Sequence, residues 1–267
     1  MSVTRLEKVY RQGERSEIVL TAHAILEGAT RPPNLVHRLE DVDPARDITF
    51  VAIEDAETCA GQVVRLVTRA LAYWFPDTDP VMDAQVLAPM HKGACGVGNL
   101  NALLQTAFDG GGPALSLGGT RFAVGDKIIQ TKNNYEKVLF NGDLGRITAV
   151  DADARRLEAN FDGEAHSFEK GELSDLAPAF AITIHKSQGS EFPFVIVPLL
   201  KQHFVMLQRN LLYPAITRGR RKVFLLGDPA AYAMAIRNTE ATVRRTGLQA
   251  LLVGGDRTGG FGAERGV

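Results

Sequence analysis

The sequence has few of the features that mark secreted, membrane-bound or metal-stabilised proteins. Only two of its 267 residues are cysteines, Cys59 and Cys95, and neither lies in a CxxC pair. Two cysteines are too few for a disulfide framework, and His91, four residues before Cys95, is too little for a zinc site. The charged first residues argue against a signal peptide, and no apolar run approaches the ~18 residues that span a membrane. We therefore expect a cytoplasmic protein with no metal site and no membrane partner.

A strong net charge is also missing. The 30 basic and 31 acidic residues give a net charge of −1, so the whole chain has no attraction to nucleic acid. Any site for a polyanion must be a local cluster of charge. The hydrophobic fraction of 45% and the length are typical of one large globular domain or two medium ones.

The third absence is a phosphate-binding loop. No Gly-x4-Gly-Lys-Ser/Thr segment occurs, and no strand ends in paired acids that would suggest a magnesium site. The nearest glycine-rich stretch, HKGACGVGNL (91–100), has no Lys-Ser or Lys-Thr after its glycines.

Apolar patterning alternates between helix and strand along much of the chain. Ser16 is a candidate N-cap and Gly28 a stop for the first helix. Helices are expected over 16–28, 55–75 and 97–108, and buried strands over 48–53, 84–89, 181–184, 194–200 and 223–227. This alternation favours an α/β fold with a parallel sheet.

A different pattern interrupts this α/β region. Gly110 to Gly112, with Gly118 and Gly119, predict a flexible joint, and residues 122–173 then alternate in short segments. Turn signals at 141–145 and 151–156 indicate hairpins, which predicts a small antiparallel barrel of SH3 size. We expect the first part of an α/β domain over residues 1–120, a barrel insertion over 121–178 and the remainder of the α/β domain over 179–250. A Gly-rich disordered tail is expected over 251–267.

The stretch HKSQGSEF (185–192) concentrates polar groups directly after an expected strand. In parallel sheets, ligands bind beyond the carboxyl ends of the strands. His185 and Lys186 can donate to phosphates, and Ser187, Gln188 and Gly189 can present donors where the next element begins. For any single residue a polar capping loop is an equal alternative, but the whole string favours a site.

A second basic stretch, RNLLYPAITRGRRKVFLLGD (209–228), precedes another expected strand. A solvated face is the default interpretation for Arg220, Arg221 and Lys222. Arg218 follows apolar residues, and a guanidinium there suits an arginine finger, which stabilises charge on a transferred phosphoryl group.

Together these stretches resemble motifs of superfamily 1 helicases, and most of all the RecD-like 5′-to-3′ DNA helicases. AITIHKSQGSEF (181–192) resembles motif V, LLYPAITRGRRKVFLLGD (211–228) motif VI, and VYRQ (9–12) motif IV. VLAPMHKGACGVGNLNALLQ (86–105) and VGDKIIQTKNNYEKVLFNGDLGRI (124–147) resemble the segment after motif IV and the start of the SH3-like insertion. The five segments follow the family's order, up to about residue 230. The resemblance implies a RecA-like (P-loop NTPase-type) parallel sheet interrupted by an SH3-like β-barrel.

The resemblance also implies positions for ATP. Arg11 and Arg218 would reach the γ-phosphate, and Gln12 would support Arg11. Gly189 would lie close to the phosphates and Glu191 near the ribose. From the residues alone, the motif with Arg11 is a weak signal, and a surface arginine is the default there.

Single-stranded DNA is the other ligand that the resemblance implies. Thr183, His185 and Lys186 would lie on the side of this strand or transmit between DNA and ATP. In the insertion, the candidates for contact with a strand are Asn133, Asn134 and Tyr135, although packing in the barrel is at least as good an interpretation of Tyr135. The lysines of the insertion could contact phosphate, with solvated surface as the default for each: Lys127, Lys132 and Lys137.

In this family the phosphate loop and the magnesium-binding acids lie in an upstream RecA-like domain, in the same or a separate chain. ATP and Mg²⁺ bind between the two domains, so the sequence corresponds to the C-terminal half of a motor used in DNA repair or recombination. Without the other wall, we expect no ATPase and no unwinding. Pro214 and Gly219 depart from motif VI and predict a kinked or short helix that presents Arg218.

Two other interpretations remain open. The chain could be a non-catalytic module that binds DNA or a protein through its barrel and keeps motifs V and VI only as ancestry. A viral or conjugative relaxase-helicase relative would carry the same motifs.

Overall fold

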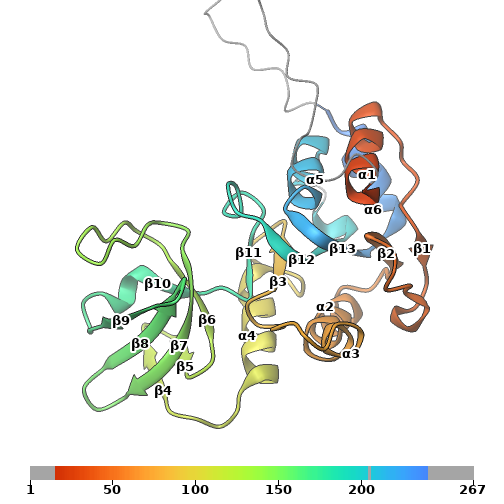
Figure 1. The fold of residues 1–267 in the computed structure, drawn as a ribbon. Coiled ribbons are helices and arrows are strands. Elements are labelled where there is room, and N and C mark those ends of the chain that lie inside the picture. The colour runs from red at the N-terminus through yellow and green to blue at the C-terminus, as the bar shows by residue number, and fades with distance from the viewer. Residues whose placement is uncertain (1–15, 204–205, 240–267) are drawn as a thin grey trace, which may run out of the picture.

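The computed structural model describes residues 16–203 and 206–239, which fold around a six-stranded parallel sheet (Figure 1). The strand order is β1-β2-β13-β12-β3-β11, and each neighbouring pair is parallel. The strands are β1 (Leu35–Val36), β2 (Ile48–Ala52), β3 (Ala84–Ala88), β11 (Ala181–Thr183), β12 (Phe192–Leu199) and β13 (Gly219–Gly227). The predicted α/β fold class is confirmed.

Helices cover both faces of the sheet, because successive strand residues point to opposite sides. Ile48 and Phe50 of β2 share one hydrophobic cluster with α1, α5 and α6, whereas Val51 shares another with α2 and α4. The helices are α1 (Glu17–Glu27), α2 (Ala56–Arg65), α3 (Leu71–Trp74), α4 (Val97–Phe108), α5 (Arg209–Ile216) and α6 (Pro229–Arg237). Short 3-10 turns are η1 (Leu39–Asp41), η3 (Leu173–Asp175) and η4 (Lys201–His203).

The first helix begins and ends where its local signals predict. The Ser16 side chain accepts a hydrogen bond from the Ile18 N–H, and Gly28, at a φ of 92°, donates to the last carbonyls of α1. The helix predicted over 55–75 also forms. It contains a π-helical segment, η2 (Leu66–Ala70), between α2 and α3, which the sequence pattern did not predict.

After α4 the chain leaves the α/β fold and forms an antiparallel barrel, and it returns to the α/β fold at β11 (Figure 1). Its strand order is β10-β6-β7-β8-β9. The strands are β6 (Lys127–Gln130), β7 (Leu144–Asp151), β8 (Arg156–Phe161), β9 (Glu164–Phe168) and β10 (Leu176–Pro178). Ile128, Ile147 and Phe161 lie in its core, and the predicted turn at 151–156 joins β7 to β8.

Gly118 and Gly119 form a hairpin turn and not part of a flexible joint. They are the two residues between β4 (Ala114–Leu117) and β5 (Thr120–Ala123), which pair antiparallel. Their φ angles of 57° and 83° are those that two-residue hairpin turns require. Leu115 and Phe122 extend this hairpin into the hydrophobic core of the barrel.

The barrel contacts the α/β domain along α4 and along the loop before β3, and we call this contact region the seam. Gln105 of α4 donates to the Asp126 carboxylate at 2.5 Å and to the Arg121 carbonyl at 2.9 Å. Arg146 of β7 forms an ion pair with Asp79 at 2.8 Å. The exact division at residues 120, 178 and 250 remains a proposal, and the tail over 251–267 lies outside the described residues.

Within the described ranges, no helix combines the length and the apolar character needed to cross a membrane.

Candidate functional site

Residues 184–190, which we call the polar loop, follow β11 at the edge of the sheet. The loop is folded into turns: the Lys186 N–H donates to the Thr183 hydroxyl, and the Ser187 hydroxyl donates to the Ile184 carbonyl at 2.7 Å. Ser187 is 1% exposed, so its hydroxyl builds the loop. Gly189 has a φ of 92° where the chain turns towards β12, which explains the need for glycine there.

Two buried amides hold the segment that leads into the polar loop. Asn101 of α4 donates to the Ala181 carbonyl at 2.8 Å and accepts from the Ala181 N–H at 2.9 Å. Gln85 of β3 donates to the carbonyls of Ala179 and Phe180. Because β11 is an edge strand, Asn101 replaces the neighbouring strand that it lacks. Sequence reasoning missed both amides, since their partners lie 80 to 95 residues away.

Replacing Asn101 by Ala is expected to lower the free energy of unfolding by about 1–3 kcal/mol, because both backbone groups of Ala181 lose their buried partner. Urea unfolding of the native and variant chains measures this loss. Asn99→Ala is the matched control on the same helix, since the Asn99 amide makes an exposed bond to the Ala94 carbonyl. Equal losses in both variants would contradict the role given to Asn101.

A cavity of about 470 Å³ lies beside the polar loop, between α4 and the β4–β5 hairpin. Thr183 and Lys186 line it, together with His91 and Arg121. Burial lowers the pKa of Lys186. The structure thus brings two of the residues predicted to face DNA together with His91 and with Arg121, whose guanidinium is paired with Asp109 at 2.8 Å. The exposed His185 does not line this cavity.

The far end of the polar loop contacts Arg218. The Arg218 guanidinium donates from Nη1 to the Ser190 carbonyl at 3.0 Å and from Nε to the Pro214 carbonyl at 3.3 Å. The Phe192 N–H donates to the Arg218 carbonyl at 2.8 Å. Glu191 and Arg218 therefore lie on adjacent segments, directly before β12 and β13. A guanidinium has five N–H donors, so these two bonds leave donors for a ligand.

The helix before Arg218 is short, as predicted, but Gly219 has no part in this. α5 has eight residues, contains Pro214 and ends at Ile216. Gly219 belongs to β13, so its helix propensity is irrelevant. A Cβ atom at Gly219 would lie 2.4 Å from a methyl carbon of Val223, and this close packing explains the glycine.

Two lysines that were expected on solvated surface are buried. Lys222 is 8% exposed and donates to the Arg46 carbonyl at 2.6 Å, while Arg220 and Arg221 remain exposed as expected. Lys127 is 0% exposed and donates to two carbonyls of the α/β domain. The expectation was wrong for both lysines because the segments that cover them are distant in sequence. Lys132 and Lys137 of the barrel pair with Asp175 and Glu172.

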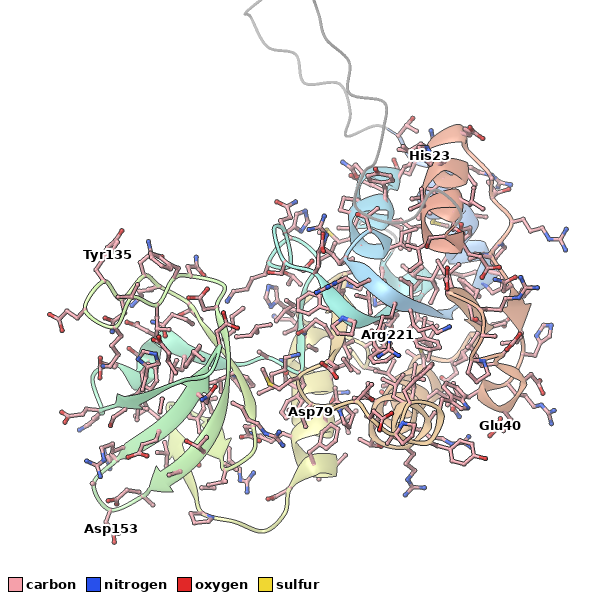
Figure 2. All side chains as sticks on the ribbon, viewed as in Figure 1. His23, Glu40, Asp79, Tyr135, Asp153 and Arg221 are labelled. Carbon is pink, nitrogen blue, oxygen red and sulfur yellow. The ribbon has the colours of Figure 1, made fainter. Side chains whose placement is uncertain are left out.

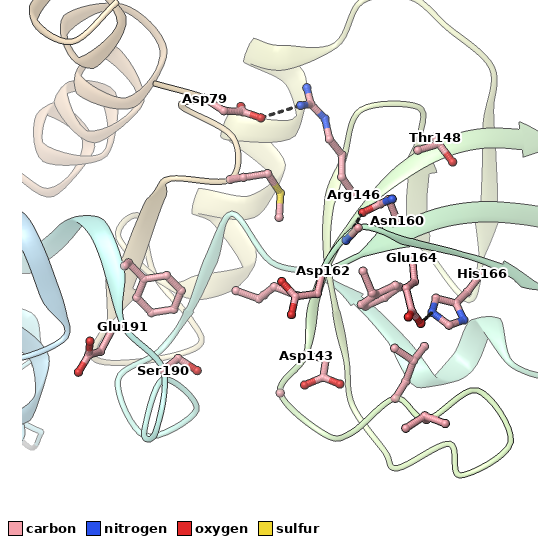
Figure 3. Close-up of a pocket in the computed structure, with 18 of the residues that line it drawn as sticks. Asp79, Asp143, Arg146, Thr148, Asn160, Asp162, Glu164, His166, Ser190 and Glu191 are labelled. Carbon is pink, nitrogen blue, oxygen red and sulfur yellow. Dashed lines mark hydrogen bonds and ion pairs between the residues drawn. The ribbon is translucent and has the colours of Figure 1, made fainter. Parts of the chain in front are cut away.

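A second cleft, of about 970 Å³, separates the barrel from the start of β12 (Figure 3). Ser190 and Glu191 lie on the β12 side of it. Its lining carboxylates are Asp79, Asp143, Asp162, Glu164 and Glu191. The lining guanidinium, Arg146, is paired with Asp79, so the cleft is acidic and unfavourable for a phosphate backbone. No sequence motif indicated it, because the barrel and the sheet each supply part of its wall.

The loop between β6 and β7 holds the three residues predicted to contact a DNA strand. Asn133 accepts from the Asn141 N–H at 2.9 Å and donates to the Tyr135 hydroxyl at 3.2 Å. Asn134 accepts from the Lys137 N–H at 3.1 Å. Both amides therefore organise the loop, while Tyr135 is 77% exposed at the outer end of the barrel (Figure 2).

The remaining predicted site residues, Arg11 and Gln12, lie outside the described residues. Across the described part of the chain, no group of three or more His, Cys, Asp and Glu side chains could hold a metal ion.

Family models match two stretches of the chain. Residues 178–226 match the UvrD-like helicase C-terminal domain, and residues 100–161 match the SH3 domain of ATP-dependent RecD-like DNA helicases. The first stretch contains the polar loop and Arg218, and the second contains most of α4 and the strands β4 to β8. The chain carries the SH3 and UvrD-like C-terminal domains of RecD-like superfamily 1 helicases.

The RecD-like chain is 33% identical over 231 residues to the ATP-dependent RecD2 DNA helicase of Deinococcus radiodurans. The aligned region covers 86% of this chain and 29% of the relative. It is 31% identical over 214 residues to the RecBCD enzyme subunit RecD of Mycobacterium tuberculosis, with coverages of 79% and 35%. The chain thus spans about a third of the length of these relatives. Among solved structures it is similar to a Bacteroides Pif1 helicase in complex with ADP-AlF3 and ssDNA, with 17% identity, a TM-score of 0.47 and coverages of 82% and 50%.

Proposed function

We propose that this RecD-like chain is the C-terminal part of an ATP-dependent DNA helicase motor that works in the cytoplasm. Its partner would be a RecA-like domain that carries the phosphate loop, in the same or a separate chain. The observation that carries the proposal is the position of the polar loop. One end of the loop lines a cavity with basic groups, and the other end contacts Arg218. A single loop between two ligand sites can couple movement along DNA to ATP hydrolysis.

On the nucleotide side, ATP and Mg²⁺ would lie between the partner domain and the surface formed by Glu191 and Arg218. Arg11 and Gln12, from the segment that precedes α1 in the sequence, would also contact the nucleotide. Two neutral carbonyls hold Arg218 in place. Phosphate oxygens carry negative charge and can accept two parallel bonds from one guanidinium, which neutral carbonyls cannot offer, and this favours an exchange when ATP binds. A Cβ atom at Gly189 would meet open space, so the backbone there is accessible to a phosphate.

On the DNA side, single-stranded DNA would cross the cavity lined by Thr183 and Lys186, with His185 exposed next to it. His91 and Arg121 lie on the opposite wall, where Arg121 also forms an ion pair with Asp109 at 2.8 Å. The acidic cleft repels phosphate, which supports placing the strand at the basic cavity. Tyr135, whose hydroxyl accepts a hydrogen bond from Asn133, would stack on a base, in a loop that Asn134 helps to organise.

We expect the chain by itself to bind single-stranded DNA with an affinity that falls as salt rises. For single strands the slope of log K against log salt is about −0.7 per neutralised phosphate, so Lys186→Ala should flatten the slope by about 0.7. Fluorescence anisotropy with oligo-dT between low and moderate salt measures both slopes. Lys170→Ala, which removes an equal charge from an exposed site on the barrel, is the control and should leave the slope unchanged. Binding without any salt dependence would rule out the DNA-facing surface.

A further inference from the structure

Lys127 is a fully buried cation in the seam between the barrel and the parallel sheet. It belongs to β6 of the barrel, yet its Nζ donates to the carbonyls of Met82 and Ala84, at 3.1 and 2.9 Å, where the chain enters β3. Among the described residues its hydrogen-bond acceptors are carbonyls and not carboxylates. Burying an ammonium group without an ion pair is costly, so an apolar residue would be expected if packing alone mattered.

The same ammonium group faces the segment between the polar loop and β12. Lys127 Nζ lies 5.7 Å from the centre of the Phe192 ring, within the range of a cation–π contact. Phe192 directly follows Glu191, and its backbone N–H is bonded to the Arg218 carbonyl. The cation thus reaches the residues assigned to the nucleotide side through one aromatic ring.

The backbone of Lys127 contacts the segment that leads into β11 and from there into the polar loop. Its carbonyl accepts from the Ala179 N–H at 2.8 Å. Ala179 lies two residues before β11, which leads into the polar loop. One barrel residue therefore binds the segment that enters the loop and the segment that leaves it.

We propose that Lys127 is a positioning residue that holds the barrel against the segments on either side of the polar loop, at Ala179 before β11 and at Phe192 after the loop, so that the position of the barrel determines the position of Phe192, Glu191 and Arg218. Any effect of Lys127 on ATP hydrolysis rests on the function proposed above, whereas the attachment of the barrel by Lys127 does not. The other ionic contact of the seam described here, Arg146–Asp79, is 42% and 40% exposed, and water competes for it. The buried lysine makes its contacts where the local dielectric is low and each bond is stronger.

The first test follows the Phe192 ring by NMR in chain labelled with ¹³C-phenylalanine, with the signal assigned through Phe192→Leu. Burial lowers the pKa of Lys127 to about 7, so the ring signal should shift between pH 6 and pH 8.5 as the ammonium group loses its proton. The charged groups near Lys127 are Asp79, Asp83, Arg146 and Glu191. In Lys127→Met the shift should be lost. The Phe194 ring, 5.2 Å from the Arg221 guanidinium, is an internal control that should not shift.

The second test measures whether the barrel stays in place. Spin labels at Asp153→Cys on the barrel and Tyr73→Cys on the α/β domain use two exposed positions, and the native cysteines are buried. The distribution of distances between the two spin labels should be narrow in the labelled chain that is otherwise native. It should broaden with Lys127→Met and stay narrow with Arg146→Ala. A Phe192 signal that ignores pH in the native chain, or a distribution unchanged by Lys127→Met, would overturn the proposal. The titration of the native chain needs no substitution and uses neither ATP nor DNA, so it separates this proposal from the proposed function.

Discussion

Replacing Arg218 by Ala is expected to abolish ATP hydrolysis in a motor that joins this chain to a phosphate-loop domain. An arginine finger contributes about 10³–10⁵ to kcat, so the rate should fall by about a thousandfold or more. The assay would fuse this chain to the N-terminal region of the Deinococcus radiodurans RecD2 helicase, to which its matching region is 33% identical. Hydrolysis stimulated by single-stranded DNA would be measured for the native fusion and for the variant.

Two further variants give this experiment its controls. Arg220→Ala removes the same charge from an exposed residue two positions away and should keep the rate. Arg218→Lys keeps the charge but loses the planar fork, and it should remain strongly impaired. An unchanged rate of ATP hydrolysis in Arg218→Ala would contradict the proposal that Arg218 is an arginine finger. A native fusion that binds DNA but hydrolyses no ATP would favour the non-catalytic module, and hydrolysis by the chain alone would contradict the need for a partner domain.

The free energy of unfolding should rise with pH because of Lys127, by an amount on the order of 5 kcal/mol. Burial lowers the pKa of Lys127 from 10.5 to about 7. Between these two values the unfolded chain binds a proton that the folded chain does not, so raising the pH favours the folded state. Below about pH 7 the ammonium group is charged in both states, and the gain is absent. Urea unfolding between pH 6 and pH 10 would measure it.

Other titrating groups also contribute to such a curve, so the informative quantity is the difference between native chain and Lys127→Met. This difference should widen in favour of the native chain as the pH rises from 7 to 10. Lys170→Met, at an exposed position of the barrel, should run parallel to the native curve. A Lys127→Met curve that is also parallel would mean that the folded chain holds Lys127 with an ordinary pKa.

Local signals predicted the secondary structure well because they act over short distances. α4 occupies the predicted range 97–108, and α1 ends at Gly28, where a left-handed residue closes the helix. The pair Gly118 and Gly119 shows how such a signal can be misread. Two glycines permit a flexible joint and a tight hairpin turn equally, and here the packing of Leu115 and Phe122 in the barrel core decides for the turn.

The candidate site was predictable to the extent that it lies on one continuous stretch. The polar loop and Arg218 were found from residue types and order, and the structure places them in contact through the Ser190 carbonyl. The cavity beside the loop was not predictable, since His91 and Arg121 join it only through folding. Asn101 was missed for the same reason: its amide resembles any polar residue in a helix until its partner, Ala181, is known.

The sequence by itself determined the α/β class, the barrel insertion and the order of the polar segments, because hydrophobic period and turn residues act between near neighbours. Only the tertiary structure decided which charged groups meet water. Lys127 and Lys170 are both lysines, a residue type that is rarely fully buried, yet Lys127 is fully buried and Lys170 is exposed. The difference arises from Met82 and Ala84, 45 and 43 residues earlier in the chain, whose carbonyls meet the Lys127 ammonium group in the seam. Solvation depends on everything that surrounds a side chain, and neighbours in sequence are only part of that environment.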